Sequence, residues 1–227
     1  MNGVLLFLAP NTQKLLDNRE RILASAYAHF STKGYHGTTI KDIASSLKMS
    51  KKTIYFQFRH KEDLFVEVGK MKLASFVTLS EQIIYSDRSF VLKLIDYLEM
   101  MHEHVRHLSL KVLHDVFNDN GKLSKIVYDH VNSAVFDRFS LLLKQGYDEK
   151  MIDDRVDPVV SLLMYKETLI SFLFGKTADH SAKMEKEFHV FLCKQLRSFF
   201  RGLLSREGTA QFDEHFDKLP HLTKVYG

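Results

Sequence analysis

The pattern of apolar and polar residues predicts helices along almost the whole chain. Apolar positions recur three and four residues apart, as on one face of a helix, and the two-residue alternation of strands is absent. Only three prolines and ten glycines interrupt the 227 residues. The sequence therefore predicts an all-α protein. Its helices are expected at residues 18–33, 40–47, 51–58, 61–80, 89–108, 110–117, 123–145, 158–174 and 181–204.

The stretch from residue 38 to residue 61 predicts two short helices joined by a tight turn. Thr39 and Asp42 have the spacing of a capping box, in which a hydroxyl and a carboxylate bind the free N–H groups at a helix start. Ser50 is suited to cap the second helix. The residues expected to face inward are Ile40, Ile43, Ala44 and Leu47 in the first helix and Ile54 and Phe58 in the second.

The outward face of the second helix carries one sign of charge. Lys51 and Lys52 lie in its first turn, where cations oppose the helix dipole and cost up to about 1 kcal/mol. No acid occurs between Asp42 and Glu62, whereas five basic residues do. An arriving phosphate would reverse that cost, since the helix start and the ammonium groups both attract it. The alternative is an ordinary solvated basic face.

The charge of the whole chain is distributed unevenly. The formal net charge is +4, which alone is weak evidence for a nucleic-acid partner. Residues 1–78, however, hold twelve Lys and Arg against six Asp and Glu, while the remainder holds twenty against twenty-two. The basic excess therefore coincides with the two short helices, as expected for a DNA-binding segment.

A sequence motif runs through the same region. It consists of Gly34-Tyr35, Thr38-Thr39-Ile40, Asp42-Ile43-Ala44, Ser50, Thr53-Ile54-Tyr55, Phe58 and Lys61-Glu62-Asp63-Leu64-Phe65. In type and spacing this run resembles the DNA-binding domain of TetR-type transcriptional regulators, over about residues 18–68. The resemblance implies a double-stranded DNA operator as partner. The expected DNA-binding residues are Thr38, Thr39, Lys48, Ser50, Lys51, Lys52, Thr53, Tyr55, Phe56, Gln57 and Lys61.

The resemblance also implies a two-domain homodimer. We expect a flexible arm at residues 1–17, a helix-turn-helix domain at 18–66, an effector-binding and dimerisation domain at 67–208, and a tail at 209–227. The last two long helices are apolar on more than one face, which indicates either a dimer interface or a thick core. The residues predicted to form the interface are Leu162, Leu169, Phe172, Phe188, Leu192, Leu196, Phe199 and Leu203.

Methionine, aromatic and histidine side chains gather in the middle helices. An apolar cavity with a few polar groups suits a small apolar effector, although such residues are more often plain core. The candidate ligand residues are Met100, Met101, His104, His107, Phe117, Tyr128, Phe136 and Met164. The i, i+3 pair of His104 and His107 lacks a Cys or carboxylate that would complete a metal site, so neither a metal nor another cofactor is expected.

Several classes of protein are disfavoured. No phosphate-binding glycine loop, nucleophile elbow or His-Glu-x-x-His motif is present, which argues against an enzyme. The apolar run at residues 4–9 is too short to span a membrane, and the single cysteine, Cys193, fits a reducing cytoplasm. The resemblance to TetR-type regulators implies a homodimeric repressor that a small apolar effector releases from a palindromic operator. A ligand-independent architectural or cell-division DNA-binding protein is the alternative.

Overall fold

The computed structural model describes residues 10–106, 109, 111, 112, 115, 116, 122–174, 195 and 197–219; the side chains of residues 10–14, 105, 106, 122 and 168–174 lie outside that description. Within these residues the fold is all-α, as predicted, and the one extended contact is an isolated bridge between Ile152 and Leu204. The elements are α1 (Pro10–Lys33), α2 (Ile40–Ser46), α3 (Lys51–Gln57), α4 (Lys61–Ile84), α5 (Phe90–Arg106), α7 (Lys122–Val131), the π-helix η2 (Asn132–Asp137), α8 (Arg138–Asp148), α9 (Pro158–Phe174) and α11 (Arg206–Phe216).

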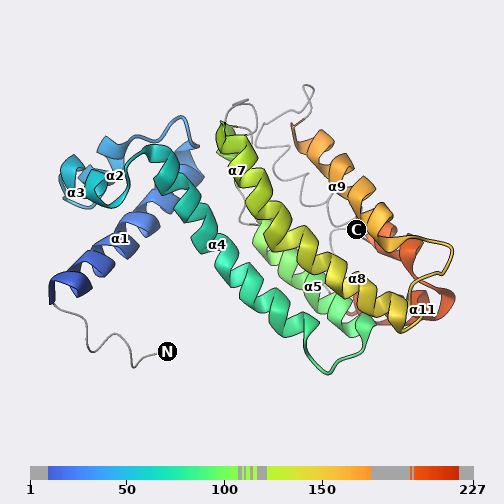
Figure 1. Ribbon diagram of the computed structural model, residues 1–227. Coiled ribbons are helices and arrows are strands. Elements are labelled where there is room, and N and C mark those ends of the chain that lie inside the picture. Colours follow the sequence, from blue (N-terminus) through green and yellow to red (C-terminus); the bar gives the residue numbers. More distant parts are fainter. Residues whose placement is uncertain are drawn as a thin grey trace.

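The helices form a small head and a larger body joined by α4. Helices α1, α2 and α3 gather around the start of α4, and the rest of α4 runs along the body formed by α5, α7, η2, α8, α9 and α11 (Figure 1). Helix α4 contacts α1 at one end and α5 and α8 along the body. Because a single rigid helix belongs to both parts, a displacement of one part is transmitted to the other.

The predicted caps of the short head helices are confirmed. The backbone N–H of Asp42 donates to Thr39 Oγ1 at 3.1 Å, and the N–H of Thr39 donates to Asp42 Oδ2 at 3.1 Å, which completes the capping box. The Ser50 hydroxyl accepts from the N–H of Thr53 at 3.1 Å. These bonds satisfy backbone donors that a seven-residue helix cannot satisfy internally, and so fix where α2 and α3 begin.

A residue in the left-handed backbone conformation, Lys48, follows the end of α2 in the turn that leads to α3. Lys48 has a φ of +54°, and the N–H of Met49 donates to Ala44 O at 2.9 Å. This six-to-one bond, with the bond from the N–H of Lys48 to Ser45 O at 3.2 Å, is a Schellman motif. Met49 then packs on the head core, as the motif favours. The tight turn predicted from the sequence is therefore built by backbone hydrogen bonds.

The head core includes two residues of the body. Its buried residues from the head are Ile22, Leu23, Ala26, Phe30, Tyr35, Ile40, Ile43, Ala44, Ile54, Phe58, Leu64, Phe65 and Val68. Val116 and Leu123, from the body, are buried in the same cluster at 1% and 5% exposure. Burial of this kind stabilises by about 25 cal/mol per Å² of apolar surface, so both parts gain from staying together.

Helix α4 ends at Ile84 and not near residue 80, and three further differences from the predicted helices are informative. Helix α1 begins at Pro10 and not near residue 18. The residues before 18 have no apolar stripe that would predict a helix, but adding residues to an existing helix is easier than starting one. Gly146 does not end α8, which continues to Asp148. A Cβ on Gly146 would lie 2.4 Å from the Phe90 ring, so the glycine permits close packing of α8 on α5. The third difference is α11, in what was expected to be a tail.

Helix α11 belongs to the body core. Phe212 and Phe216 are 0% and 2% exposed, and their rings stack with centroids 5.1 Å apart. The helix packs against α5, and Ser205 caps its first turn by accepting from the N–H of Gly208 at 3.2 Å. Among the described residues, no helix combines the length and the apolar character that a membrane crossing needs.

Candidate nucleic-acid interface

Helix α3 presents an exposed face of basic, hydroxyl and aromatic side chains. Lys51 and Lys52 are exposed, and Tyr55 and Phe56 remain 50% and 73% exposed. On the opposite face Ile54 is fully buried. An aromatic side chain as exposed as Phe56 contributes nothing to the monomer core, so this face is available to a partner.

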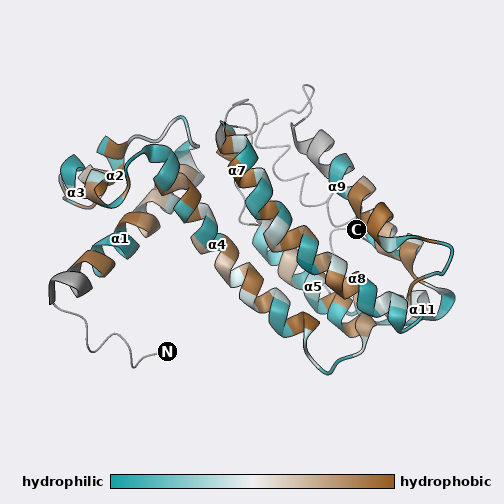
Figure 2. Cartoon of the chain, viewed as in Figure 1, coloured by the Kyte–Doolittle hydropathy of each residue, from teal (hydrophilic) through white to brown (hydrophobic). Residues whose placement is uncertain are grey.

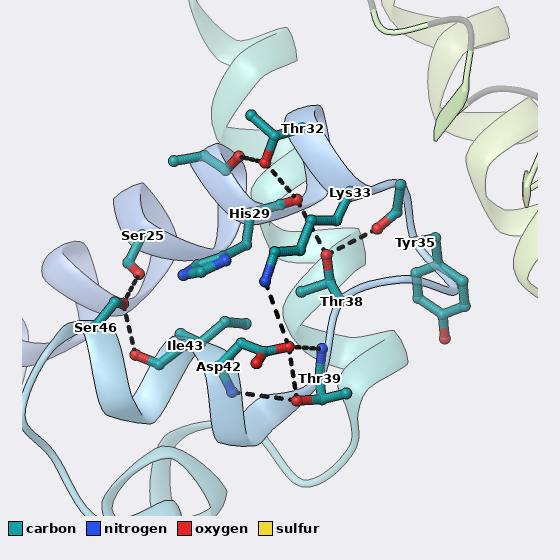
Figure 3. Close-up of polar contacts among 12 residues, drawn as sticks. Ser25, His29, Thr32, Lys33, Tyr35, Thr38, Thr39, Asp42, Ile43 and Ser46 are labelled. Carbon is teal, nitrogen blue, oxygen red and sulfur yellow. Dashed lines mark hydrogen bonds and ion pairs between the residues drawn. The ribbon is translucent and has the colours of Figure 1, made fainter.

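Thr38 lies beneath the interface and not on it. Its side chain is fully buried, and its hydroxyl lies 3.0 Å from His29 O and 2.8 Å from Gly34 O. Figure 3 draws the contact between Thr38 and His29. The expectation that Thr38 contacts DNA is therefore corrected: its hydroxyl is used to close the loop between α1 and α2. The sequence could not distinguish Thr38 from its exposed neighbour Thr39.

Thr39 and Asp42 form an internally paired polar group at the start of α2. The hydroxyl of Thr39 donates to Asp42 Oδ2 at 2.9 Å, and Lys33 Nζ lies 3.9 Å from the same oxygen (Figure 3). The hydrogen bonds from the Thr39 side chain and backbone lower the pKa of Asp42 below its ordinary value. The one acid of α2 therefore keeps its charge, but that charge is directed into the capping box.

Lys61 supports the same loop from the first turn of α4. Its Nζ donates to Tyr35 O at 3.0 Å and to Thr38 O at 3.2 Å, and it lies 4.1 Å from the centroid of the Tyr35 ring. Burial is the main cause that lowers the pKa of Lys61 below its ordinary value. A direct contact of Lys61 with DNA stays a prediction, and the structure gives this residue a second, structural role.

The remaining predicted DNA-binding residues surround α3. The hydroxyls of Ser50 and Thr53 lie 2.9 Å apart and share a hydrogen bond at the helix start. Gln57 donates through Nε2 to Leu15 O at 3.3 Å, which ties the end of α3 to α1. Lys48 is exposed in the turn. Lys48, Ser50, Thr53 and Gln57 thus lie on α3 or in the turn that precedes it.

Two residues that position the head were not predicted from the sequence. Arg19 on α1 pairs with Glu67 on α4 at 2.7 Å and lies 4.5 Å above the Phe58 ring. Asp115 of the body accepts from the N–H of His36 at 3.1 Å, in the loop between α1 and α2. No local pattern in the sequence marks either contact, because the partners are 48 and 79 residues apart.

The body contains an apolar cavity of about 30 Å³ between α5, η2, α8 and α9. It is lined by Met101, Val135, Phe136, Phe139, Leu162, Tyr165 and Phe200. Of the predicted ligand residues, Met101 and Phe136 line this cavity. Met100 is buried in the core, and His104 hydrogen-bonds through Nδ1 to Met100 O at 2.8 Å.

The other predicted ligand residues do not line the cavity. Met164 is 67% exposed on the outer side of α9, which corrects its assignment to a ligand site. Tyr128 is half-buried on α7, and His107 and Phe117 lie outside the described residues. In the described part of the chain, no three His, Cys, Asp or Glu residues are placed to hold a metal ion.

The predicted dimer residues that the structure describes face the monomer core. Leu162 and Leu203 are each 4% exposed, and Phe199 stacks on Tyr165 with ring centroids 4.5 Å apart. The assignments of Leu162 and Leu203 to the interface are corrected, because a buried side chain cannot contact a second copy. Phe199 is partly buried, and its place in an interface stays a prediction. The side chains of Leu169, Phe172, Phe188, Leu192 and Leu196 lie outside the described residues.

A different apolar surface of α9 is exposed. Its members are Val159, Val160, Leu163 and Met164, at 48%, 51%, 50% and 67% exposure. Figure 2 shows the first part of α9 as largely hydrophobic. We call these four residues the α9 outer stripe. An exposed apolar surface of this kind is typical of a contact with another protein.

Comparisons with known proteins agree with this geometry. Residues 22–68 match the family described as bacterial regulatory proteins, tetR family. The biofilm operon icaADBC HTH-type negative transcriptional regulator IcaR of Staphylococcus aureus (strain Newman) is 38% identical over 52 residues, which cover 23% of this chain and 28% of that protein. The chain thus matches about a quarter of the length of its curated relatives.

Solved structures are similar over most of the chain. A transcriptional regulator from Cytophaga hutchinsonii has a TM-score of 0.63 and 21% identity, over 82% of this chain and 98% of that one. FadR from Bacillus subtilis, solved with stearoyl-CoA, has a TM-score of 0.58 and 18% identity, over 76% and 96%. Residues 22–68 therefore match the DNA-binding domain of the tetR family, and most of the chain shares the fold of these solved structures.

Proposed function

We propose that this protein is a homodimeric transcriptional repressor that binds a palindromic DNA operator through α3 and is released by a small effector. The observation that carries the proposal is the exposed face of α3, with two lysines beside Tyr55 and the 73% exposed Phe56. Lysines are suited to phosphates, and hydroxyl and aromatic groups are suited to sugars, thymine methyls and base edges. The relative IcaR is named a negative transcriptional regulator, which supports repression.

The contacts between head and body support regulation by an effector. Val116 and Leu123 are buried in the head core, and Asp115 binds the loop that follows α1. A ligand that binds one arrangement of the body better than another would therefore favour one head position, by its differential affinity for the two.

A homodimer is proposed because one α3 reads too few base pairs for a specific genomic site. Two heads on a twofold axis would read half-sites about one helical turn, roughly 34–36 Å, apart. The α9 outer stripe supplies an apolar patch on the side of the body that the monomer core leaves uncovered. An isologous contact places the same patch of each copy at the axis.

Selection of binding sites from random DNA tests the proposed readout. The wild type should enrich a palindrome, and Phe56→Ala should lose preference at one symmetric pair of positions, worth about 1–3 kcal/mol each. Thr53 is the other candidate for base readout, and Tyr55 is assigned to phosphate. Tyr85→Ala, which removes an aromatic side chain 72% exposed in the body, is the control. Enrichment of no motif by the wild type would contradict sequence-specific binding.

Neutralising Lys52 should weaken binding to every DNA sequence about equally. Each lost phosphate contact reduces the slope of log affinity against log salt by about 0.9, and a homodimer loses one contact per copy, so the slope should fall by roughly 1.8. A salt titration by fluorescence anisotropy of Lys52→Ala against wild type measures this slope. Lys218→Ala, an exposed lysine after α11, is the matched control and should leave the slope unchanged. An unchanged slope for Lys52→Ala would remove that residue from the interface.

A further inference from the structure

A lysine lies on the buried face of α9. Lys166 is one turn after the cavity residue Leu162 and next to the cavity residue Tyr165, and it is only 7% exposed. An apolar residue would be expected at such a position, because an ammonium group is expensive to bury. A charge retained there needs a compensating partner.

The partners of Lys166 among the described residues compensate its charge only in part. Its Nζ donates to Asn132 Oδ1 at 3.0 Å, and this amide is neutral. Among the described residues, the carboxylate oxygen paired with Nζ is Glu167 Oε1, 3.9 Å away on a side chain that is 65% exposed. The rings of Tyr128 and Phe136 have centroids 5.5 and 5.6 Å from Nζ, near the limit of a cation–π contact.

The other buried lysine among the described residues has a structural explanation. Lys93 donates to Ile84 O at 3.0 Å and to Gln145 Oε1 at 3.1 Å. Ile84 is the last residue of α4, where carbonyl groups lack helical partners and attract a cation. Within the described part of the chain, the Nζ of Lys166 instead donates to a side-chain amide, Asn132 Oδ1, and not to a carbonyl at a helix end.

The π-helix η2 carries both the amide that binds Lys166 and two of the side chains that line the apolar cavity. Asn132, which binds Lys166, is its first residue, while Val135 and Phe136 line the cavity. The wider π-turn is held by side chains: Tyr97 donates to Val135 O at 3.1 Å and Arg138 donates to Ser133 O at 3.0 Å. Such π-turns are rare and are frequently found at functional sites.

We propose that the effector is an amphipathic carboxylate whose carboxylate group binds Lys166 and whose hydrocarbon part enters the adjoining cavity. This inference rests on the proposed function and specifies its ligand as an organic anion rather than a neutral apolar compound. The carboxylate completes the pairing of a buried cation, and a charge-assisted hydrogen bond of this kind is worth about 1.5–3 kcal/mol. The 30 Å³ cavity is about the volume of one water, so the hydrocarbon chain displaces flexible side chains such as Met101.

Isothermal titration calorimetry of the full chain, without DNA, tests the proposal. The probes are hexanoate, octanoate and decanoate, each compared with the alcohol of the same chain length. Wild type should bind at least one carboxylate about ten- to a hundredfold more tightly than its alcohol, the ratio that 1.5–3 kcal/mol implies. Lys166→Met should lose this preference and still bind the alcohol, since Met retains the apolar stem of the side chain.

Two further variants test whether the charge of Lys166 itself causes the preference for carboxylates. Lys166→Gln removes the charge while keeping a group able to hydrogen-bond Asn132, and it should lose the preference as Lys166→Met does. Lys125→Met, on the exposed side of α7, is the matched control and should keep it. Thermal unfolding of each variant, followed by circular dichroism, establishes that it is folded.

The proposal would be overturned if wild type bound none of the carboxylates, bound acid and alcohol equally, or kept its preference in a folded Lys166 variant. Any of these results leaves DNA binding untouched, because the titration contains no DNA. Conversely, a protein that prefers carboxylates but binds no operator would contradict the proposed function alone.

Discussion

Replacing Leu163 with aspartate should convert a dimer into a monomer and reduce operator affinity by at least a hundredfold. Leu163 is at the centre of the α9 outer stripe and is 50% exposed in the single chain. In a twofold contact, each copy would bring a carboxylate into the apolar centre, where it is desolvated without a partner at a cost of about 3–5 kcal/mol per chain. Two separate heads would then have to find the two half-sites independently, without the gain of a linked second contact.

Sedimentation velocity at micromolar concentration measures the first half of this prediction, and anisotropy with the selected operator measures the second. Leu79→Asp is the control, since Leu79 is 43% exposed on α4 and lies outside the α9 outer stripe. It should remain dimeric with unchanged affinity. A wild-type monomer that still binds its operator tightly would remove both the dimer and the mechanism based on head spacing.

The second large effect concerns stability. Phe212→Ala should lower the free energy of unfolding by about 3–5 kcal/mol, because it leaves a cavity under a ring that is 0% exposed and stacked on Phe216. For a chain of this length, each kcal/mol lowers Tm by roughly 2–4 °C, so the expected decrease is about 10 °C. Differential scanning calorimetry measures it.

Phe56→Ala provides the matched comparison for that variant. It removes the same side chain from a position that is 73% exposed, so Tm should change by less than about 2 °C while DNA readout is lost. The two phenylalanine variants thus separate stability from recognition. Equal Tm values for Phe212→Ala and wild type would show that α11 is dispensable to the body core.

Local features of the sequence predicted local features of the structure well. The capping box of Thr39 and Asp42 and the cap at Ser50 depend on residues within one turn of each other, so their spacing was sufficient. The same holds for α9, where Asp157 Oδ1 accepts from the N–H groups of Val159 and Val160 at 2.9 and 3.0 Å, directly at the predicted start.

Long-range packing could not be predicted in the same way. Helix α9 has apolar residues on several faces, and hydrophobicity alone does not tell which face is inward: Leu162 is 4% exposed and its neighbour Leu163 is 50% exposed. Glycine is common just after the end of a helix, so Gly146 was expected to end one. It instead lies inside α8, where a Cβ would clash with the Phe90 ring. Helix α11 was missed because only two of its residues are large and apolar, whereas their burial depends on α5.

The shared core between head and body limits how the chain can be recombined. A hybrid that joined residues 18–66 to the body of another regulator would lose Val116 and Leu123 from its core and the carboxylate of Asp115 from the His36 amide. Gly34, with φ +78°, is equally adapted to this neighbour, since a Cβ there would lie 2.4 Å from Asp115 Oδ2. A transplantable cassette therefore has to carry the segment from Val112 to Val127, both of which pack on the head core, together with the helix-turn-helix.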